Sequence, residues 1–232
     1  QKKLPALADE RILSLLESRR DNIANINAIL DSLNERTGMS ELIRVDNLAS
    51  TAMQMTVATS RGDVVKTGRL QSLTGLYGNM TLVRGALPGE KQDNIYQALA
   101  TEEALLSLGA EIGDIISCVP RLDTTFVPIK VQITGTFDVD PAKSLAWGFF
   151  KPVMFKDSLL LGSGDARELF LGTPVLAASI RSYVAYDYGQ MLSKGLDAFS
   201  LLSSELNREL HTSGADFEMP VLKKAADFAA RE

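Results

Sequence analysis

The sequence has very few of the residues on which metal binding and acid–base catalysis depend. It contains a single cysteine, Cys118, and a single histidine, His211, among 232 residues. One cysteine excludes an internal disulfide, and these two residues alone cannot build a metal site of the usual Cys and His type. Stability is therefore expected to come from packing, with Cys118 as a small buried hydrophobe in an apolar run.

Long apolar runs and basic stripes are also missing. No stretch of about 18 apolar residues occurs, so the sequence contains no candidate membrane helix. Acidic and basic residues are scattered and give a net charge of −5, which argues against nucleic acid as a partner. The chain begins with Gln1 rather than Met, and we expect a processed protein or a piece of a longer one.

Both ends of the chain carry the apolar spacing of amphipathic helices. A first helix is predicted between a cap at Asp9 and a stop at Gly38. Its apolar stripe consists of Ile12, Leu15, Leu16, Ile23, Ile26, Leu30 and Leu33. A second helix is predicted from Asp187 to Gly214, with a stripe of Met191, Leu192, Leu196, Phe199, Leu202, Leu206 and Leu210. A last helix is predicted over 220–232.

The middle of the chain is β-rich. Strands are predicted over 51–59, 80–84, 112–119, 126–137 and 177–186, because β-branched and alternating apolar residues gather there. Gly62-Asp63 predicts a hairpin-like turn between two β-prone runs. One short helix is predicted over 102–108, with Thr101 as its cap and Gly109 after its end.

Four short motifs look like functional sites but have simpler explanations. The glycine pair in 162–165 lacks the remaining residues of a phosphate-binding loop, so it is interpreted as capping a short helix over 166–171. Asp138 and Asp140 could bind calcium or act as an acid–base pair, but Asp140-Pro141 is a common turn signal. Asn79 begins a formal glycosylation sequon. His211 is expected at an exposed helix end.

The aromatic segment 147–150 leaves two interpretations open. Trp147, Phe149 and Phe150 lie between glycine and proline, and they either plug the core at the end of the sheet or contact a partner or an apolar ligand. These three residues are therefore the candidate partner-contact residues. We predict no catalytic residue, no metal ligand and no cofactor.

Three stretches of the middle region follow one another in a specific order and spacing. They are Arg84-Gly85-Ala86-Leu87-Pro88-Gly89; Glu102-Glu103-Ala104 with Leu108-Gly109-Ala110-Glu111-Ile112-Gly113-Asp114-Ile115-Ile116; and Val131-Gln132-Ile133-Thr134-Gly135-Thr136-Phe137. In this respect the chain resembles the FtsX/MacB-like ABC transporter permeases over roughly residues 85–150. The chain departs from the family at 97–101, where the family usually has a strand rich in β-branched residues before the helix.

The resemblance implies an α+β fold with a discontinuous organisation. A mixed α/β, membrane-proximal subdomain with long terminal helices would be built from both chain ends, residues 1–74 and 176–232. A small β-rich subdomain with one short helix, residues 75–175, would be inserted into it. The domain would lie on the extracytoplasmic side of the cell membrane, between two membrane helices.

The resemblance also implies a non-catalytic function. The domain would handle a substrate or a partner protein and transmit an ATP-driven conformational change. Its partners would be a cytoplasmic ATP-binding subunit or domain, reached through the membrane helices, and an envelope protein, lipid or peptide; a second permease protomer is a further candidate. No catalytic residue of the family is carried over.

Two alternatives from other classes remain open. A ligand-sensing extracytoplasmic domain of a receptor or sensor kinase would share the helical ends and mixed sheet, with Tyr183, Tyr186 and Tyr188 as its pocket candidates. A hydrolase would have to use His211 as its base and a nucleophile such as Ser163.

Overall fold

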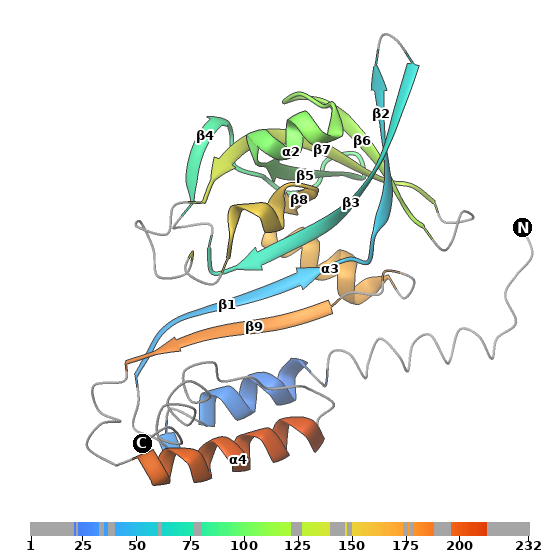
Figure 1. The fold of residues 1–232 in the computed structure, drawn as a ribbon. Helices are drawn as coiled ribbons and strands as arrows, with labels where there is room; N and C mark the ends of the chain where they lie inside the picture. Colours follow the sequence, from blue (N-terminus) through green and yellow to red (C-terminus); the bar gives the residue numbers. More distant parts are fainter. Residues whose placement is uncertain are drawn as a thin grey trace, which may run out of the picture. The chain divides into compact units, whose positions relative to one another are not determined.

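The computed structural model describes most of the middle of the chain and parts of both ends (Figure 1). The described residues are 21, 23–32, 35–36, 40–59, 62–76, 80–121, 127–139, 147, 150–173, 176, 179–187 and 196–212. The chain divides into two compact units. We call residues 43–185 the sheet unit, and residues 1–42 with 186–232 the terminal unit.

The sheet unit is built around one large mixed sheet, whose first and last strands reach one or two residues beyond the unit's bounds. Its strands are β1 (Glu41–Ala49), β2 (Met53–Thr59), β3 (Gly62–Thr74), β4 (Thr81–Gly85), β5 (Ile95–Ala100), β6 (Ile115–Pro120), β7 (Ile129–Asp138), β8 (Ser158–Leu161) and β9 (Ser179–Tyr186). The other elements are α2 (Glu102–Leu108), η3 (Pro152–Phe155) and α3 (Ser163–Gly172). The fold is therefore α+β, as predicted.

The sheet closes on itself. The strand order β2-β6-β7-β5-β8-β3 returns to its start because β3 also pairs with β2. Outside this closed sheet, β1 and β9 continue from β3, and β4 adds to the far end of β7 (Figure 1). Closure removes most free strand edges, which is how small β-rich folds limit unwanted pairing.

Strand β7 shows why the sequence forms this sheet. Ile129, Val131 and Ile133 are buried, and the residues between them are exposed or half-buried. This alternation confirms the predicted strand, although its start moves from 126 to 129. Val127 precedes the strand and is 79% exposed, so its side chain does not share the buried face.

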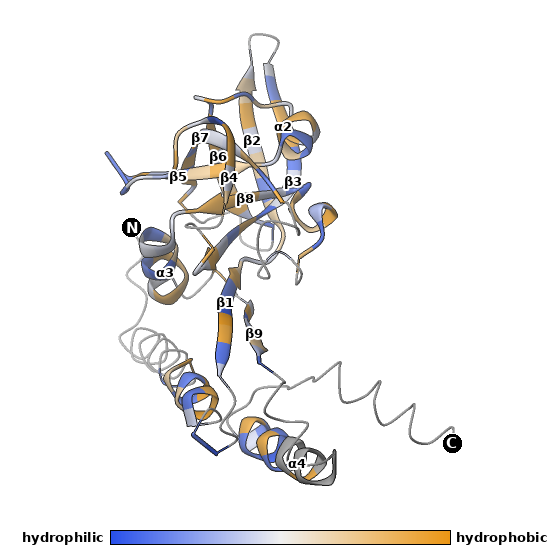
Figure 2. Ribbon diagram, turned by 90° about the vertical axis from the view of Figure 1, so that its left-hand side faces the viewer, coloured by the Kyte–Doolittle hydropathy of each residue, from blue (hydrophilic) through white to orange (hydrophobic). Residues whose placement is uncertain are grey.

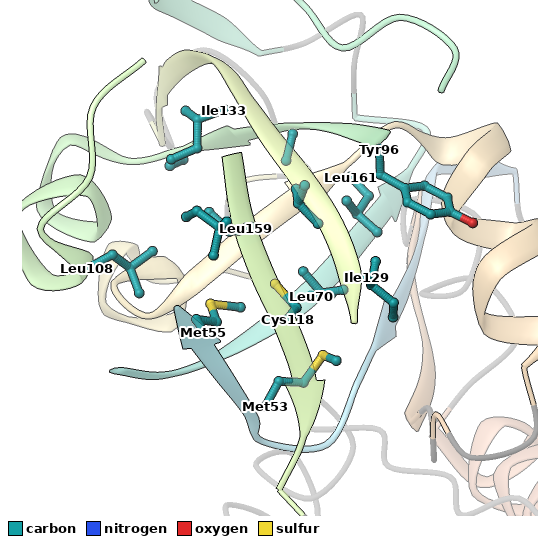
Figure 3. Close-up of a cluster of buried hydrophobic side chains, with 14 of the residues drawn as sticks. Met53, Met55, Leu70, Tyr96, Leu108, Cys118, Ile129, Ile133, Leu159 and Leu161 are labelled. Atoms are coloured by element: carbon teal, nitrogen blue, oxygen red, sulfur yellow. The ribbon is translucent and has the colours of Figure 1, made fainter. Parts of the chain in front are cut away.

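Two hydrophobic clusters fill the sheet unit. The larger one contains Met53, Met55, Leu70 and Cys118, all 0% exposed, and Figure 3 shows these side chains gathered between the strands. The second cluster contains Leu73 together with aromatic residues. Leu70 and Leu73 lie on the same strand at an odd spacing, so they reach opposite faces and opposite clusters.

Helix α2 begins and ends where the sequence predicts. The Thr101 hydroxyl accepts a hydrogen bond from the Ala104 backbone N–H at 3.1 Å, which satisfies one of the free donors of the first turn. Gly109 ends the helix in the left-handed conformation, with φ of 67°. Leu105 and Leu108 are buried, whereas Leu106 is 83% exposed.

Three of the described strands, β1, β5 and β8, were not predicted from the sequence patterns. Strand β5 covers 95–100 and lies at the centre of the sheet, between β7 and β8, although its alanines carry little β-propensity. The sequence analysis assigns no element to 41–49 or 158–161, which form β1 and β8. All four residues of β8 are buried, so this strand shows no alternation that could mark it.

The predicted turns and helices shift slightly in the structure. Thr59 pairs with Gly62 in the β2–β3 hairpin, so Gly62 and Asp63 begin β3 instead of forming the turn. Helix α3 begins at Ser163, three residues earlier than predicted. Strand β9 begins at Ser179, close to the predicted 177.

Contacts within the chain divide it at 42/43 and 185/186, and the subdomain boundaries expected at 74/75 and 175/176 stay a prediction. Strand β3 pairs with β1, β2 and β8, so residues 43–74 belong to the same sheet as the predicted insertion. Both chain ends still share one unit, and that unit is discontinuous in sequence.

The terminal unit contains helices from both ends of the chain. Residues 23–32 and 35–36 are helical, and α4 covers Leu196–Thr212. The predicted caps at Asp9, Gly38 and Gly214 and the helix over 220–232 lie outside the described residues. Among the described helices, none has both the length and the hydrophobicity that a membrane span requires.

Candidate functional site

The motif residues of the middle region meet at the junction of β4, α2 and β7. Arg84 of β4 donates two hydrogen bonds to the Glu102 carboxylate, at 2.9 and 2.8 Å. Thr136 of β7 donates its hydroxyl hydrogen to the same carboxylate at 2.8 Å. Three elements that are distant in sequence are thus joined through the first residue of α2.

The two glycines of these motifs allow β4 and β7 to approach closely. Gly85 pairs with Gly135 in the antiparallel ladder, and Gly85 has φ of 80°. A Cβ on Gly135 would lie 2.6 Å from the Arg84 carbonyl oxygen. Neither position therefore has room for a side chain without movement of the backbone.

The turn after α2 is hydrogen-bonded to strand β7. The Gly113 N–H donates to the Ile133 carbonyl at 2.8 Å, and the Ile133 N–H donates to the Asp114 carbonyl at 3.0 Å. The Asp114 carboxylate accepts from the Glu111 N–H at 2.8 Å. Gly113 has φ of 101°, which favours glycine at this position.

The ion pair in this region is exposed. The hydrogen bond from Arg84, and then that from Thr136, lowers the pKa of the Glu102 carboxyl. The hydrogen bond to Glu102 raises the pKa of Arg84. Their side chains are 59% and 49% exposed, so water and salt weaken the attraction. The arrangement holds three elements in register.

The loop after β4 is held against β5 and α3. The Gly89 N–H donates to the Gln97 side-chain carbonyl at 2.7 Å. Lys91 pairs with Glu168 at 2.9 Å and lies 5.6 Å from the centre of the Tyr96 ring. The hydrogen bond to Glu168 raises the pKa of Lys91, and burial raises the pKa of Tyr96. These contacts fix the path of the loop.

Two of the three candidate contact residues lie in the core. Trp147 and Phe150 are 1% and 2% exposed. The Trp147 ring packs with those of Phe137 and Phe155 at centroid distances of 6.2 and 6.1 Å, and the Phe150 ring packs with that of Phe155 at 6.0 Å. Their position matches the core-plug interpretation and leaves them no surface for a partner. Phe149 lies outside the described residues, so a contact role for it stays a prediction.

The structure describes two of the three tyrosines that the sensing alternative proposes as pocket residues. The Tyr183 ring stacks edge-on with Phe150, with centroids 5.0 Å apart, and Tyr186 is 5% exposed. Tyr188 lies outside the described residues. Tyr183 thus belongs to the aromatic cluster, and this position does not favour a ligand pocket over core packing.

Cys118 and His211 lie where the simpler explanations place them, and the turn predicted at 138–141 stays a prediction. Cys118 is buried, and burial raises its pKa to about 12. His211 lies in the last turn of α4 and is exposed. Asp138 ends β7, whereas Asn79 and Asp140 lie outside the described residues. Within the described part of the chain, no group of three or more metal-ligating His, Cys, Asp or Glu side chains occurs.

Sequence reasoning missed a set of exposed apolar side chains. The most exposed is Leu106 on α2, at 83%, and Val153 and Met154 on η3 are 63% and 38% exposed. Ser107 beside Leu106 donates to Asp157, just after η3, at 3.0 Å. An α-helical spacing alone could not identify Leu106, because α2 has only two turns.

Comparisons with known proteins give matches among solved structures only. No protein-family description and no curated protein matches the sequence. The chain is similar to the extracellular domain of the noncanonic ABC-type transporter YknZ from Gram-positive bacteria, with 14% identity, a TM-score of 0.42 and 84% of each chain covered. It is also similar to a domain of a candidate permease protein from Porphyromonas gingivalis, with 14% identity, a TM-score of 0.41, and 83% of this chain and 71% of that one covered.

Proposed function

We propose that this chain is a non-catalytic, extracytoplasmic domain of an FtsX/MacB-like ABC transporter permease. It handles a substrate or a partner protein and transmits an ATP-driven conformational change. In this proposal a cytoplasmic ATP-binding subunit or domain acts on it through membrane helices beyond the two chain ends.

The observation that carries the proposal is the meeting of the permease-like motifs at one junction. Arg84, Glu102 and Thr136 come from the three separate stretches that carry the resemblance, and they form one hydrogen-bonded group. The motifs thus share a structural role, which explains why these residue types occur in this order. The discontinuous terminal unit supports the placement between two membrane helices, because both chain ends belong to it.

The proposal is tested by determining on which side of the cell membrane the domain lies. Leu106→Cys in the full-length protein introduces an exposed thiol, whereas the native Cys118 is buried. In intact cells a membrane-impermeant maleimide should label the Leu106→Cys variant and leave its parent unlabelled, where the parent is the full-length protein with any cysteine outside residues 1–232 replaced by serine. Labelling that requires lysis of the cells would place the domain inside the cytoplasm and overturn the proposal.

The sensing alternative predicts a different full-length protein. A permease of this kind should have three further membrane helices after the domain, whereas a sensor should have one followed by a signalling helix. Mapping the membrane topology of the full-length protein with reporter fusions after residue 232 separates the two.

A further inference from the structure

The terminal unit joins two helices that lie at opposite ends of the chain. The helical residues 23–32 and 35–36 lie beside α4 in Figure 1, although the residues that make the contact are 169 and 173 positions apart in sequence. The backbone connection between them runs through the whole sheet unit. Non-covalent contacts must therefore hold the two helices together.

Arg36 joins these helices through side-chain hydrogen bonds. Its Nη1 donates to both carboxylate oxygens of Glu209, at 3.1 and 3.0 Å, and its Nη2 donates to Glu205 at 2.9 Å. One guanidinium thus binds two carboxylates of α4. A planar guanidinium suits this geometry, which an ammonium cannot reproduce.

The position of the two glutamates makes this contact more than an ordinary surface pair. Glu205 and Glu209 lie one turn apart on α4, and like charges at this spacing weaken a helix. Arg36 offsets their repulsion from the neighbouring helix. Its side chain is only 32% exposed, and Leu206 and Leu210 on α4 are buried. Figure 2 shows apolar and polar residues on both helices.

We propose that Arg36, Glu205 and Glu209 form an ionic clasp that makes the two chain-end helices move as one body. A displacement that reaches one chain end is then carried to the other through the clasp. The role of the clasp in transmitting movement rests on the proposed function, in which that movement comes from the membrane helices. Whether the clasp holds the two helices together does not depend on that function. Its strength depends on salt, because all three groups are partly exposed.

A distance measurement on the 232-residue chain tests the clasp. Spin labels are attached through Ala28→Cys and Asn207→Cys, at exposed positions of the two helices, and double electron–electron resonance measures their separation. With Arg36 present we expect one narrow distance distribution. Arg36→Met should add a longer-distance population. In the unsubstituted background, about 1 M salt should have the same effect, since screening then acts within about 3 Å.

Matched variants separate the clasp from a general loss of structure. Arg208→Met removes the same charge from an exposed position of α4 and should leave the distribution narrow. Arg36→Glu combined with Glu205→Lys and Glu209→Lys should restore the narrow distribution that Arg36→Glu alone loses. Circular dichroism verifies that each variant is folded, and the salt series needs no variant at all.

Three results would overturn the clasp. They are a narrow distribution in Arg36→Met, equal broadening in Arg208→Met, and a salt series without effect. None of these results bears on the side of the membrane on which the domain lies. Conversely, cytoplasmic labelling at position 106 would overturn the proposed function and leave the clasp intact.

Discussion

Gly85 and Gly135 face each other across the β4–β7 ladder so closely that neither can carry a side chain in place. A Cβ added to Gly85 would lie 2.6 Å from the Gly135 Cα, and one added to Gly135 would lie 2.9 Å from the Ala86 carbonyl oxygen. This contact brings Arg84 to the carboxylate of Glu102 at the start of α2. The two glycines therefore permit the junction on which the proposed function rests.

Gly135→Ala should destabilise the chain. The new methyl group meets backbone atoms that cannot rotate away, so we expect a loss of about 2 kcal/mol in the free energy of unfolding, as for overpacked cores. Urea denaturation measures this loss. Gly164→Ala is the control, because nothing lies within 4 Å of a Cβ there; it should be neutral or gain about 0.5 kcal/mol. Equal effects would contradict the close contact.

Thr101→Ala should weaken α2 by removing its cap. The Thr101 hydroxyl accepts from the Ala104 N–H, and loss of such a cap costs about 1 kcal/mol. Thr101→Ser keeps the oxygen and should retain most of the stability. Chemical denaturation of the three proteins in parallel distinguishes a cap from simple loss of a methyl group, since the latter would affect the serine variant as well.

Glu102→Gln should change how stability depends on pH. The pKa of Glu102 is lower in the folded chain than its usual value, so the ionised form stabilises the fold above the usual carboxyl range. This contribution is lost as the pH falls through the lowered pKa. The stability difference between wild type and Glu102→Gln should therefore shrink in acid. Glu103→Gln, one position along the helix, should show a smaller difference throughout.

Cys118 should resist thiol reagents as long as the chain is folded. Burial raises its pKa to about 12, and the thiolate is the reactive form. At pH 8 we expect modification to follow global unfolding and to become fast in denaturant. The folded pKa is raised, so stability should also fall as the pH rises above the ordinary thiol range. Rapid labelling of the folded wild type would show that Cys118 is accessible.

Local signals in the sequence were sufficient for some elements. The cap and stop of α2 depend on Thr101 and Gly109, which contact residues of the same helix, so both could be predicted. The alternation of β7 could also be predicted, because one side of the strand faces the core and the other is more exposed. Strand β8 was harder, since residues buried on both faces leave no periodic pattern, and β5 was harder because its alanines have little β-propensity.

Other features depend on contacts between residues that are distant in sequence, so the sequence patterns could not predict them. Trp147 could be assigned either to the core or to a contact surface, and only its packing against Phe137 and Phe155 places it inside. The subdomain boundaries depend on β3, which pairs with β1, β2 and β8, and such pairing is not visible in the strand itself. Arg36 gives no sequence signal either, because its partners lie in α4, near the other end of the chain.

The most direct test of the central claim is to measure whether ATP binding changes a distance within the domain. Spin labels at Ala28→Cys and Leu106→Cys would report on the terminal unit and the sheet unit of the full-length protein, reconstituted with its ATP-binding partner in lipid nanodiscs. The account predicts that the distance distribution shifts when ATP is trapped with vanadate and returns when nucleotide is removed. An unchanged distribution in a complex that hydrolyses ATP would contradict it.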